Sequence, residues 1–235
     1  MNRRVTAVTL TQSIQDHIKG LIHGGTVSPG DRLPPERELA ASLGVARVSL
    51  REAIRQLASE GYVEVRRGPQ GGTFITSLRE PFEHWRALVR NRVDEMDDMI
   101  DFRVAVESHV AALAAQRRTA DDLSAMSGAV ERLAQATALR AFRLADSQFH
   151  DAVARASRST RLETAVHQAR GEFFSPAPTF DHTLLLEDNR REHQAVYEAI
   201  RDGDAERAAA EMCAHIGHTR EQLHLWVSEG DAASH

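Results

Sequence analysis

The sequence predicts a mainly α-helical protein, in which an N-terminal winged helix-turn-helix with a small β-hairpin precedes an all-helical bundle. Two observations predict this fold class. Residues 35–60 combine a short helix, a glycine-containing turn and a second helix with cations near its start. From residue 83 onward, every local sign in the sequence favours helix. We therefore expect two domains, residues 1–78 and residues 79–235.

Helical spacing first appears in residues 7–24, which a pair of glycines ends. After a Pro-Gly turn and a short extended segment, Pro34 and Pro35 fit the first turn of the next helix, where a missing N–H donor would have had no partner. Gly44 is expected to end that helix. The second helix of the pair then places three apolar residues on one side: Leu50, Ile54 and Leu57.

A β-hairpin is predicted after the helix pair. Residues 61–66 and 72–76 contain β-branched and aromatic residues, and the loop 67–71 between them contains glycine and proline. Three helices followed by a hairpin make a winged helix. Residues 77–82 contain a proline and show no periodic pattern, which indicates a linker.

The remainder of the chain is predicted to form helices. Thr119 and Ser159 have the pattern of N-cap residues before acidic first turns, and Gly203 separates the last two helices. A proline-containing loop at residues 175–182 interrupts them. The expected helical segments are residues 83–91, 94–117, 119–136, 139–157, 160–174, 183–202 and 204–228.

Composition and charge limit the function classes. A content of 42% hydrophobic and 27% charged residues is typical of a soluble globular protein. The single cysteine excludes an internal disulfide, and the sequence has neither a signal-peptide core nor an apolar run that could cross a membrane, so we expect a cytoplasmic protein. The net charge of −5 divides into +3 for residues 1–80 and −8 for residues 81–235. The basic N-terminal part suits a nucleic-acid partner.

The start of the second helix carries side chains suited to DNA. Arg47, Ser49 and Arg51 lie off its apolar side, and the N-terminal residues of such a helix enter the major groove. An arginine can donate two hydrogen bonds to guanine, and a serine near a helix N-terminus can bond a phosphate. The alternative is that these arginines only solvate an exposed helix face.

A second group of residues lies in the helical part. Asp146 and His150 are four residues apart, which places a carboxylate and an imidazole on one helix face. His193 and His215 lie on the apolar sides of two later helices. One aspartate and three histidines from three helices can converge on a metal ion, although separate core histidines would show the same spacing. Without a thiolate ligand zinc, nickel, manganese and iron are all admissible, and zinc is the first candidate.

The N-terminal motifs resemble those of the GntR family of transcriptional regulators. The resemblance spans about residues 8–76 and is carried by the stretch Pro29–Ala40, the turn Leu43–Val45, the segment Leu50–Ala53 and Gly72–Phe74. Ala46 departs from the family, in which many members have serine or threonine at this position. The resemblance implies DNA contacts from six residues: Arg37, Arg47, Ser49, Arg51, Arg67 and Gly68.

The helical part resembles the ligand-binding (FCD) domain of the FadR-like subfamily, over roughly residues 83–228. Four motifs carry the resemblance: Arg103 with Glu107, Asp146 with His150, Glu192 with His193, and Met212 with His215. In metal-binding members the matching residues hold the ion, which implies the ligands Asp146, His150, His193 and His215. Arg103 matches a position near the effector cavity, where a guanidinium can clamp a carboxylate. A structural ion pair with Glu107 is the alternative.

These features together predict a DNA-binding transcriptional regulator, which we expect to be a repressor. A homodimer would bind a pseudo-palindromic double-stranded DNA operator, and the helical domain would bind a small carboxylate effector with the help of the metal ion. We expect no catalytic residues and no membrane association. The alternatives are a metalloenzyme that activates water at the His/Asp site, a metal-free regulator that binds an acyl ligand, and a sensor whose effector is the metal itself.

Overall fold

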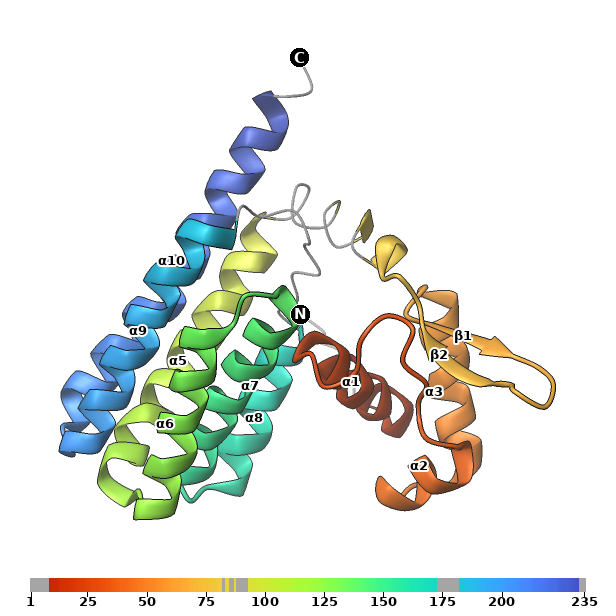
Figure 1. Ribbon diagram of the computed structural model, residues 1–235, viewed down its shortest axis with the longest axis horizontal. Coiled ribbons are helices and arrows are strands. Elements are labelled where there is room, and N and C mark those ends of the chain that lie inside the picture. The colour runs from red at the N-terminus through yellow and green to blue at the C-terminus, as the bar shows by residue number, and fades with distance from the viewer. Residues whose placement is uncertain (1–8, 82, 85–86, 88–92, 173–181, 233–235) are drawn as a thin grey trace, which may run out of the picture. The chain divides into compact units, whose positions relative to one another are not determined.

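The chain folds into two compact units, Met1–His84 and Trp85–His235. Figure 1 shows the computed structural model, which describes residues 9–81, 83–84, 87, 93–172 and 182–232. Among these residues, no helix is both long and apolar enough to cross a membrane.

The first unit is a winged helix-turn-helix, as the sequence predicts. Its first helix begins at Leu10 instead of residue 7, because the Oγ1 atom of Thr9 accepts a hydrogen bond from the Gln12 N–H and caps the helix there. Residues 7 and 8 lie outside the described part of the chain. The elements of this unit are α1 (Leu10–His23), α2 (Glu36–Ser42), α3 (Arg47–Ser59), β1 (Val63–Arg66) and β2 (Gly72–Ile75).

The turn between α2 and α3 depends on Gly44. Its φ of 65° lies in the left-handed region that glycine adopts without strain. The N–H groups of Gly44 and Val45 donate to the carbonyls of Ala41 and Ala40, which closes the C-terminus of α2. The position of Pro35 differs from expectation, because its ψ of 140° is extended and α2 begins only at Glu36.

The wing is an antiparallel pair in which Val63 faces Ile75 and Arg66 faces Gly72. The extended segment before α2 adds to this sheet, because the Leu33 N–H donates to the Thr73 carbonyl over 2.9 Å. Apolar residues from α1, α2, α3 and both strands form the core of the unit, with Ile18, Leu50 and Leu57 fully buried. This core holds α3 against the rest of the unit by its apolar side and leaves its polar side exposed.

The second unit is all-helical in its described residues. Most of the segment expected at residues 83–91 and nearly all of the loop expected at 175–182 lie outside those residues. The helices are α5 (Val93–Arg117), α6 (Ala120–Gln135), α7 (Leu139–Ala156), α8 (Thr160–Glu172), α9 (His182–Asp202) and α10 (Ala205–Ala232).

Two of the predicted helix boundaries have the expected chemistry. Thr119 and Asp122 form a reciprocal capping box at the start of α6, in which each side chain bonds the other residue's backbone N–H. Gly203, with a φ of 80°, ends α9, and Asp204 then bonds the Arg207 N–H at the start of α10. The residues that cap the starts of α6 and α10 can therefore be recognised in the sequence.

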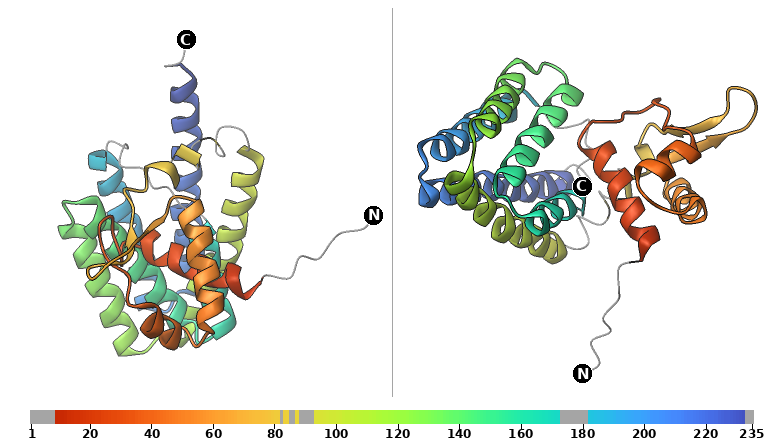
Figure 2. Two further views of the ribbon diagram at one scale, coloured as in Figure 1. Left: turned by 90° about the vertical axis from the view of Figure 1, so that its right-hand side faces the viewer. Right: turned by 90° about the horizontal axis from the view of Figure 1, so that it is seen from below.

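Helix α5 lies centrally among the helices of this unit. It contacts α7, α8, α9 and α10, and Figure 2 shows these helices in two further views. Apolar residues such as Ile100, Phe149 and Ile200 fill most of the interior. Among the described residues, the same interior also encloses five ionisable side chains, each no more than 5% exposed: Arg103, Glu107, His150, His193 and His215.

Candidate metal centre and candidate DNA-reading face

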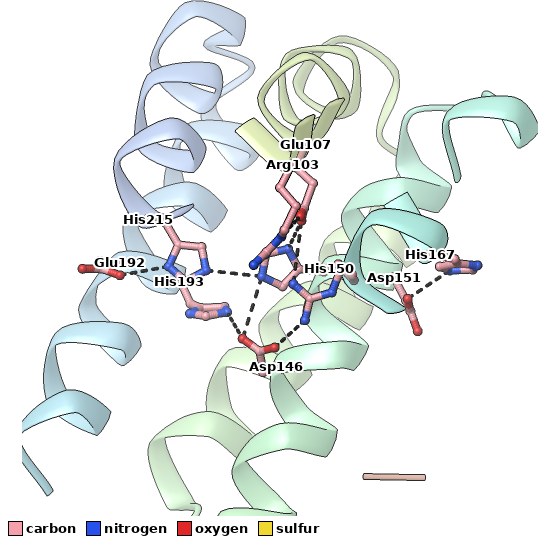
Figure 3. Close-up of polar contacts among 10 residues, drawn as sticks. Arg103, Glu107, Asp146, His150, Asp151, His167, Glu192, His193 and His215 are labelled. Carbon is pink, nitrogen blue, oxygen red and sulfur yellow. Dashed lines mark hydrogen bonds and ion pairs between the residues drawn. The ribbon is translucent and has the colours of Figure 1, made fainter. Parts of the chain in front are cut away.

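Four side chains predicted as metal ligands come together inside the helical unit. Asp146 and His150 extend from α7, His193 from α9 and His215 from α10, as Figure 3 shows. One donor atom from each residue lies within 4.8 Å of the other three. All three histidines are buried.

The donor atoms of the cluster are the three Nε2 atoms and Oδ1 of Asp146. His193 Nε2 lies 3.1 Å and His150 Nε2 lies 3.8 Å from Oδ1 of Asp146, while His150 Nε2 and His215 Nε2 are 3.3 Å apart. Donors that share one ion at about 2.1 Å are separated by roughly 3–4 Å. The observed separations therefore suit a common divalent ion.

The outer nitrogen of each imidazole faces an oxygen. His193 Nδ1 is 2.8 Å from the carbonyl oxygen of Asn189, and His215 Nδ1 is 2.9 Å from Oε2 of Glu192. His150 Nδ1 is 2.6 Å from Oε2 of Glu107. We assign the proton of each ring to Nδ1, which leaves the Nε2 lone pairs directed at one another. Metal-binding histidines show this pattern.

Without a cation these lone pairs lack a partner. His193 Nε2 is buried and has no hydrogen-bond donor or acceptor in suitable geometry among the described residues. The Nε2 atoms of His150 and His215 face each other with no proton assigned between them. Buried polar atoms are rarely left unpaired, so the chemistry of this donor set fits a divalent metal ion.

An ion-pair network surrounds the cluster on the side of α5 and α8. Glu107 is 1% exposed, and its Oε1 accepts a 2.8 Å hydrogen bond from Arg103 Nε. Arg170 of α8 bonds Oδ2 of Asp146, and its Nη1 lies 3.8 Å from Oε2 of Glu107. Glu107 therefore contacts two guanidiniums and one ligand imidazole. Arg103 lies in the ion pair that the sequence left as its alternative role.

The protonation states in this network follow from burial and charge. Burial opposes ionisation of Glu107 and Asp146, but the cations around them outweigh it and hold the pKa of each carboxyl below its usual range. Burial and the charge of Arg170 lower the pKa of His150 to about 3, and burial also lowers the pKa of His215. The carboxylates are thus ionised and both imidazoles neutral at pH 7, the forms that bind metals.

Three residues in contact with the cluster were not predicted to act there. Arg170 carries no motif in the sequence, and a basic residue in the last turn of a helix ordinarily needs no further explanation. Glu107 was expected only as a partner of Arg103, and Glu192 only as part of a motif with His193. Their contacts with the cluster join different helices, so no spacing within one helix could indicate them.

Two other histidines of α10 lie outside the cluster, as expected. His218 is about half exposed, with its Nδ1 against Oε1 of Glu192. His224 is 3.0 Å from Oδ1 of Asp97 and is also about half exposed. Neither side chain belongs to the group of converging donors.

The first unit brings the predicted DNA-contacting residues to its surface. Arg37 is exposed on α2, Arg47 and Arg51 are exposed on α3, and Ser49 is partly exposed between them. Arg67 and Gly68 are exposed in the loop that joins β1 to β2. Ala46 occupies the N-cap position of α3, where it makes no side-chain cap.

Glu36 interacts with both arginines of α3. Its Oε2 accepts a 2.7 Å hydrogen bond from Arg51 Nε and lies 3.8 Å from an Nη2 atom of Arg47. The side chains of Arg51 and Arg47 nevertheless remain 50% and 55% exposed. Surface pairs of this kind are worth at most about 1 kcal/mol, so both guanidiniums are available to another anion.

Comparisons with known proteins identify both parts of the chain. The model of the bacterial regulatory proteins of the gntR family matches residues 10–75, and the FCD domain model matches residues 98–218. The chain belongs to the GntR family and carries an FCD domain. This membership confirms the resemblance seen in the sequence.

Individual relatives agree with this membership. The putative L-lactate dehydrogenase operon regulatory protein of Escherichia coli K12 is 33% identical over 224 residues, covering 88% of this chain and 83% of that protein. The transcriptional regulator LutR of Bacillus subtilis 168 is 27% identical over 218 residues, covering 89% of this chain and 99% of LutR. The solved structure of E. coli McbR/YncC shares the fold, with a TM-score of 0.58 and 19% identity over 94% of this chain and 99% of that one.

The protein is therefore a transcriptional regulator, and its family binds DNA operators. The relatives are regulators and not enzymes, which argues against the metalloenzyme alternative. The His/Asp cluster lies within the FCD domain and could hold a metal ion.

The buried network predicts a large effect for Glu107→Gln. The amide would leave the charges of Arg103 and Arg170 without their buried carboxylate, so we expect the metal-free protein to lose about 3 kcal/mol or more of unfolding free energy at pH 7. Denaturant unfolding of the helical unit measures this loss. Glu131→Gln, an exposed change on α6, should cost no more than about 0.5 kcal/mol.

The effect of Glu107→Gln also has a predicted pH dependence. The pKa of Glu107 is lower in the folded chain than in the unfolded chain, so its stabilisation is complete above about pH 4.3 and declines as the pH falls. The stability difference between wild type and variant should shrink below that pH. A difference that is equal to that of Glu131→Gln, or that grows in acid, would contradict the assigned ion pair.

Proposed function

We propose that this protein is a ligand-responsive repressor, in which the winged helix binds an operator and the FCD domain senses a small organic acid at a metal centre. The observation that carries the sensing role is the convergence of one carboxylate and three imidazoles in the core of the helical unit. Packing of a helical core does not require four converging metal-ligand side chains, nor an oxygen beside the outer nitrogen of each imidazole. In this arrangement the metal ion, together with Arg103 and Arg170, would balance the negative charge of a bound organic acid.

DNA recognition would use six residues: Arg37, Arg47, Ser49, Arg51, Arg67 and Gly68. Arg47 and Arg51 are suited to base edges in the major groove, since each presents a half-exposed guanidinium from the first turns of α3. Arg67 and Gly68 on the wing are suited to the sugar-phosphate backbone. Because one winged helix reads one half-site, we infer a homodimer on a pseudo-palindromic operator.

The ligands Asp146, His150, His193 and His215 would hold zinc, or otherwise nickel, manganese or iron, because all their donors are nitrogen or oxygen. When bound, the ion supplies a Lewis-acidic position that can take a carboxylate oxygen. Asp146 neutralises part of its charge. Glu192 would orient the ring of His215 through its contact with Nδ1, and Glu107 would place a negative charge 2.6 Å from Nδ1 of His150.

The effector that suits this centre is a small carboxylate, and hydroxy acids are the first class to test. Arg103 and Arg170 place two guanidiniums next to the cluster, and either can clamp a carboxylate. The name of the E. coli relative, which refers to an L-lactate dehydrogenase operon, supports the same class. An effector that binds one arrangement of the dimer better than another would shift the population that can bind the operator.

The DNA-binding role predicts a strong effect for Arg47→Ala. Loss of a bidentate base contact costs about 1–3 kcal/mol, so we expect affinity for a selected operator to fall at least about fivefold, with a smaller salt dependence. Fluorescence anisotropy against salt concentration measures both quantities. Arg79→Ala removes an 82% exposed arginine outside the helix pair and serves as the control. Equal affinities for both variants would refute the recognition role of α3.

The metal centre predicts that the purified protein binds about one divalent ion per chain. His193→Ala and Asp146→Ala should each lose most of this metal, because each removes a ligand from the cluster. His224→Ala, which changes an exposed histidine on α10, should retain it. Elemental analysis after dialysis measures the content. A wild type without metal, together with unchanged ligand responses in the first two variants, would favour the metal-free acyl-ligand regulator.

The effector class predicts a stabilisation of the metal-loaded protein by one member of a panel of hydroxy acids, sugar acids and dicarboxylates, L-lactate included. A ligand at 100 times its Kd adds about 2.7 kcal/mol, which raises the Tm by several degrees. The shift should vanish in Asp146→Ala. If no acid raises the Tm while added metal alone changes operator affinity, the ion itself is the effector and the proposed acid sensing is wrong.

A further inference from the structure

Val48 is the most exposed large hydrophobic side chain among the described residues, at 77%. It is the second residue of α3, between Arg47 and Ser49. Single exposed apolar residues are common on protein surfaces, so exposure alone indicates nothing. The position of this one is informative, because it lies in the first turn of the helix whose neighbouring side chains carry the proposed base contacts.

Folding does not require valine at this position. The buried side of α3 consists of Leu50, Ala53, Ile54 and Leu57, and Val48 is not part of it. A β-branched residue also has a lower helix propensity than alanine. An apolar branched side chain that is both outside the core and unfavourable for the helix calls for a partner that the free protein lacks.

The major groove offers one apolar group for such a partner. Among the four bases, only thymine presents a methyl group there, on C5, where cytosine has a hydrogen atom, and the remaining base-edge groups are mostly hydrogen-bond donors and acceptors. Val48 can neither donate nor accept a hydrogen bond through its side chain. Its χ1 angle is restricted by β-branching, so the two methyl groups are held in one orientation from a helical backbone.

We propose that Val48 is a specificity-determining residue that selects a thymine in each operator half-site by contact with its 5-methyl group. This inference rests on the proposed DNA-reading role of α3. Arg47 and Arg51 supply hydrogen bonds to neighbouring bases or phosphates, and Val48 supplies the apolar contact that distinguishes thymine from cytosine. Val65, a second exposed valine at 60%, lies on β1 of the wing and is not part of this contact.

The test removes the methyl group from the DNA and the side chain from the protein. Full-length wild-type protein first selects its operator from random duplexes, and each thymine of one half-site is then replaced by deoxyuridine, which differs only in the missing methyl. We expect one replacement to weaken wild-type binding about fourfold, the effect of burying one methyl-sized group. The same replacement should leave binding by Val48→Ala unchanged, and Val65→Ala should keep the full fourfold penalty.

The outcomes separate this inference from the function on which it rests. Enrichment of no sequence by the wild type would overturn both. Enrichment of an operator whose thymine-to-deoxyuridine penalties are the same in wild type and Val48→Ala would overturn the role of Val48 alone. Non-additivity of the two changes at one thymine, in a double-mutant cycle, would establish the contact. Because Val48 is outside the core, the variant is expected to fold, which circular dichroism checks.

Discussion

The interior of the helical unit is constrained by the need to pair every buried charge and every buried ring nitrogen. Glu107 of α5 balances Arg103 of the same helix and reaches His150 of α7 and Arg170 of α8. Removal of one member would leave another buried without a partner, at a cost of several kcal/mol. The register of these helices is therefore specified by polar contacts as well as by packing, since a shift of one residue would turn a ligand away from the centre.

The ion pairs around Glu36 in the first unit, unlike those around Glu107 in the helical unit, are exposed to solvent. Glu36 contacts Arg47 and Arg51 at a surface where all three side chains are at least about one-third exposed. Water and salt screen such pairs, so their exchange for a phosphate or a base costs little. The pairs still keep the two guanidiniums near the start of α3. Burial therefore separates the two networks: the one at Glu107 is shielded from water and salt, whereas the one at Glu36 is open to solvent and can be replaced by DNA.

From residue spacing, the sequence could predict features that arise within one turn or one helix, but not contacts between different helices. The turn at Gly44, the cap at Thr119 and the pair of Asp146 with His150 follow from spacings within one turn or one helix. The convergence of His193 and His215 with that pair came from family resemblance, because spacing left separate core histidines open. Arg170 could not be found in either way: its role depends on α8 packing beside α7. The extra pairing of Arg32 with Phe74 of β2 likewise depends on a tertiary contact.

The location of Arg170 suggests how an acid could alter the helical unit without a large rearrangement of its core. Its guanidinium already bridges Asp146, a ligand of the proposed ion, and Glu107, the anion beside His150. A carboxylate effector beside the cluster would compete with Asp146 and Glu107 for the guanidinium of Arg170. Each Arg170 contact transferred to the effector would weaken one that now links α8 to α7 or to α5. Effector binding and helix packing would then use the same hydrogen-bond donors. The effector would bind more tightly to an arrangement in which these donors are released, and such a difference in affinity is what shifts a conformational equilibrium.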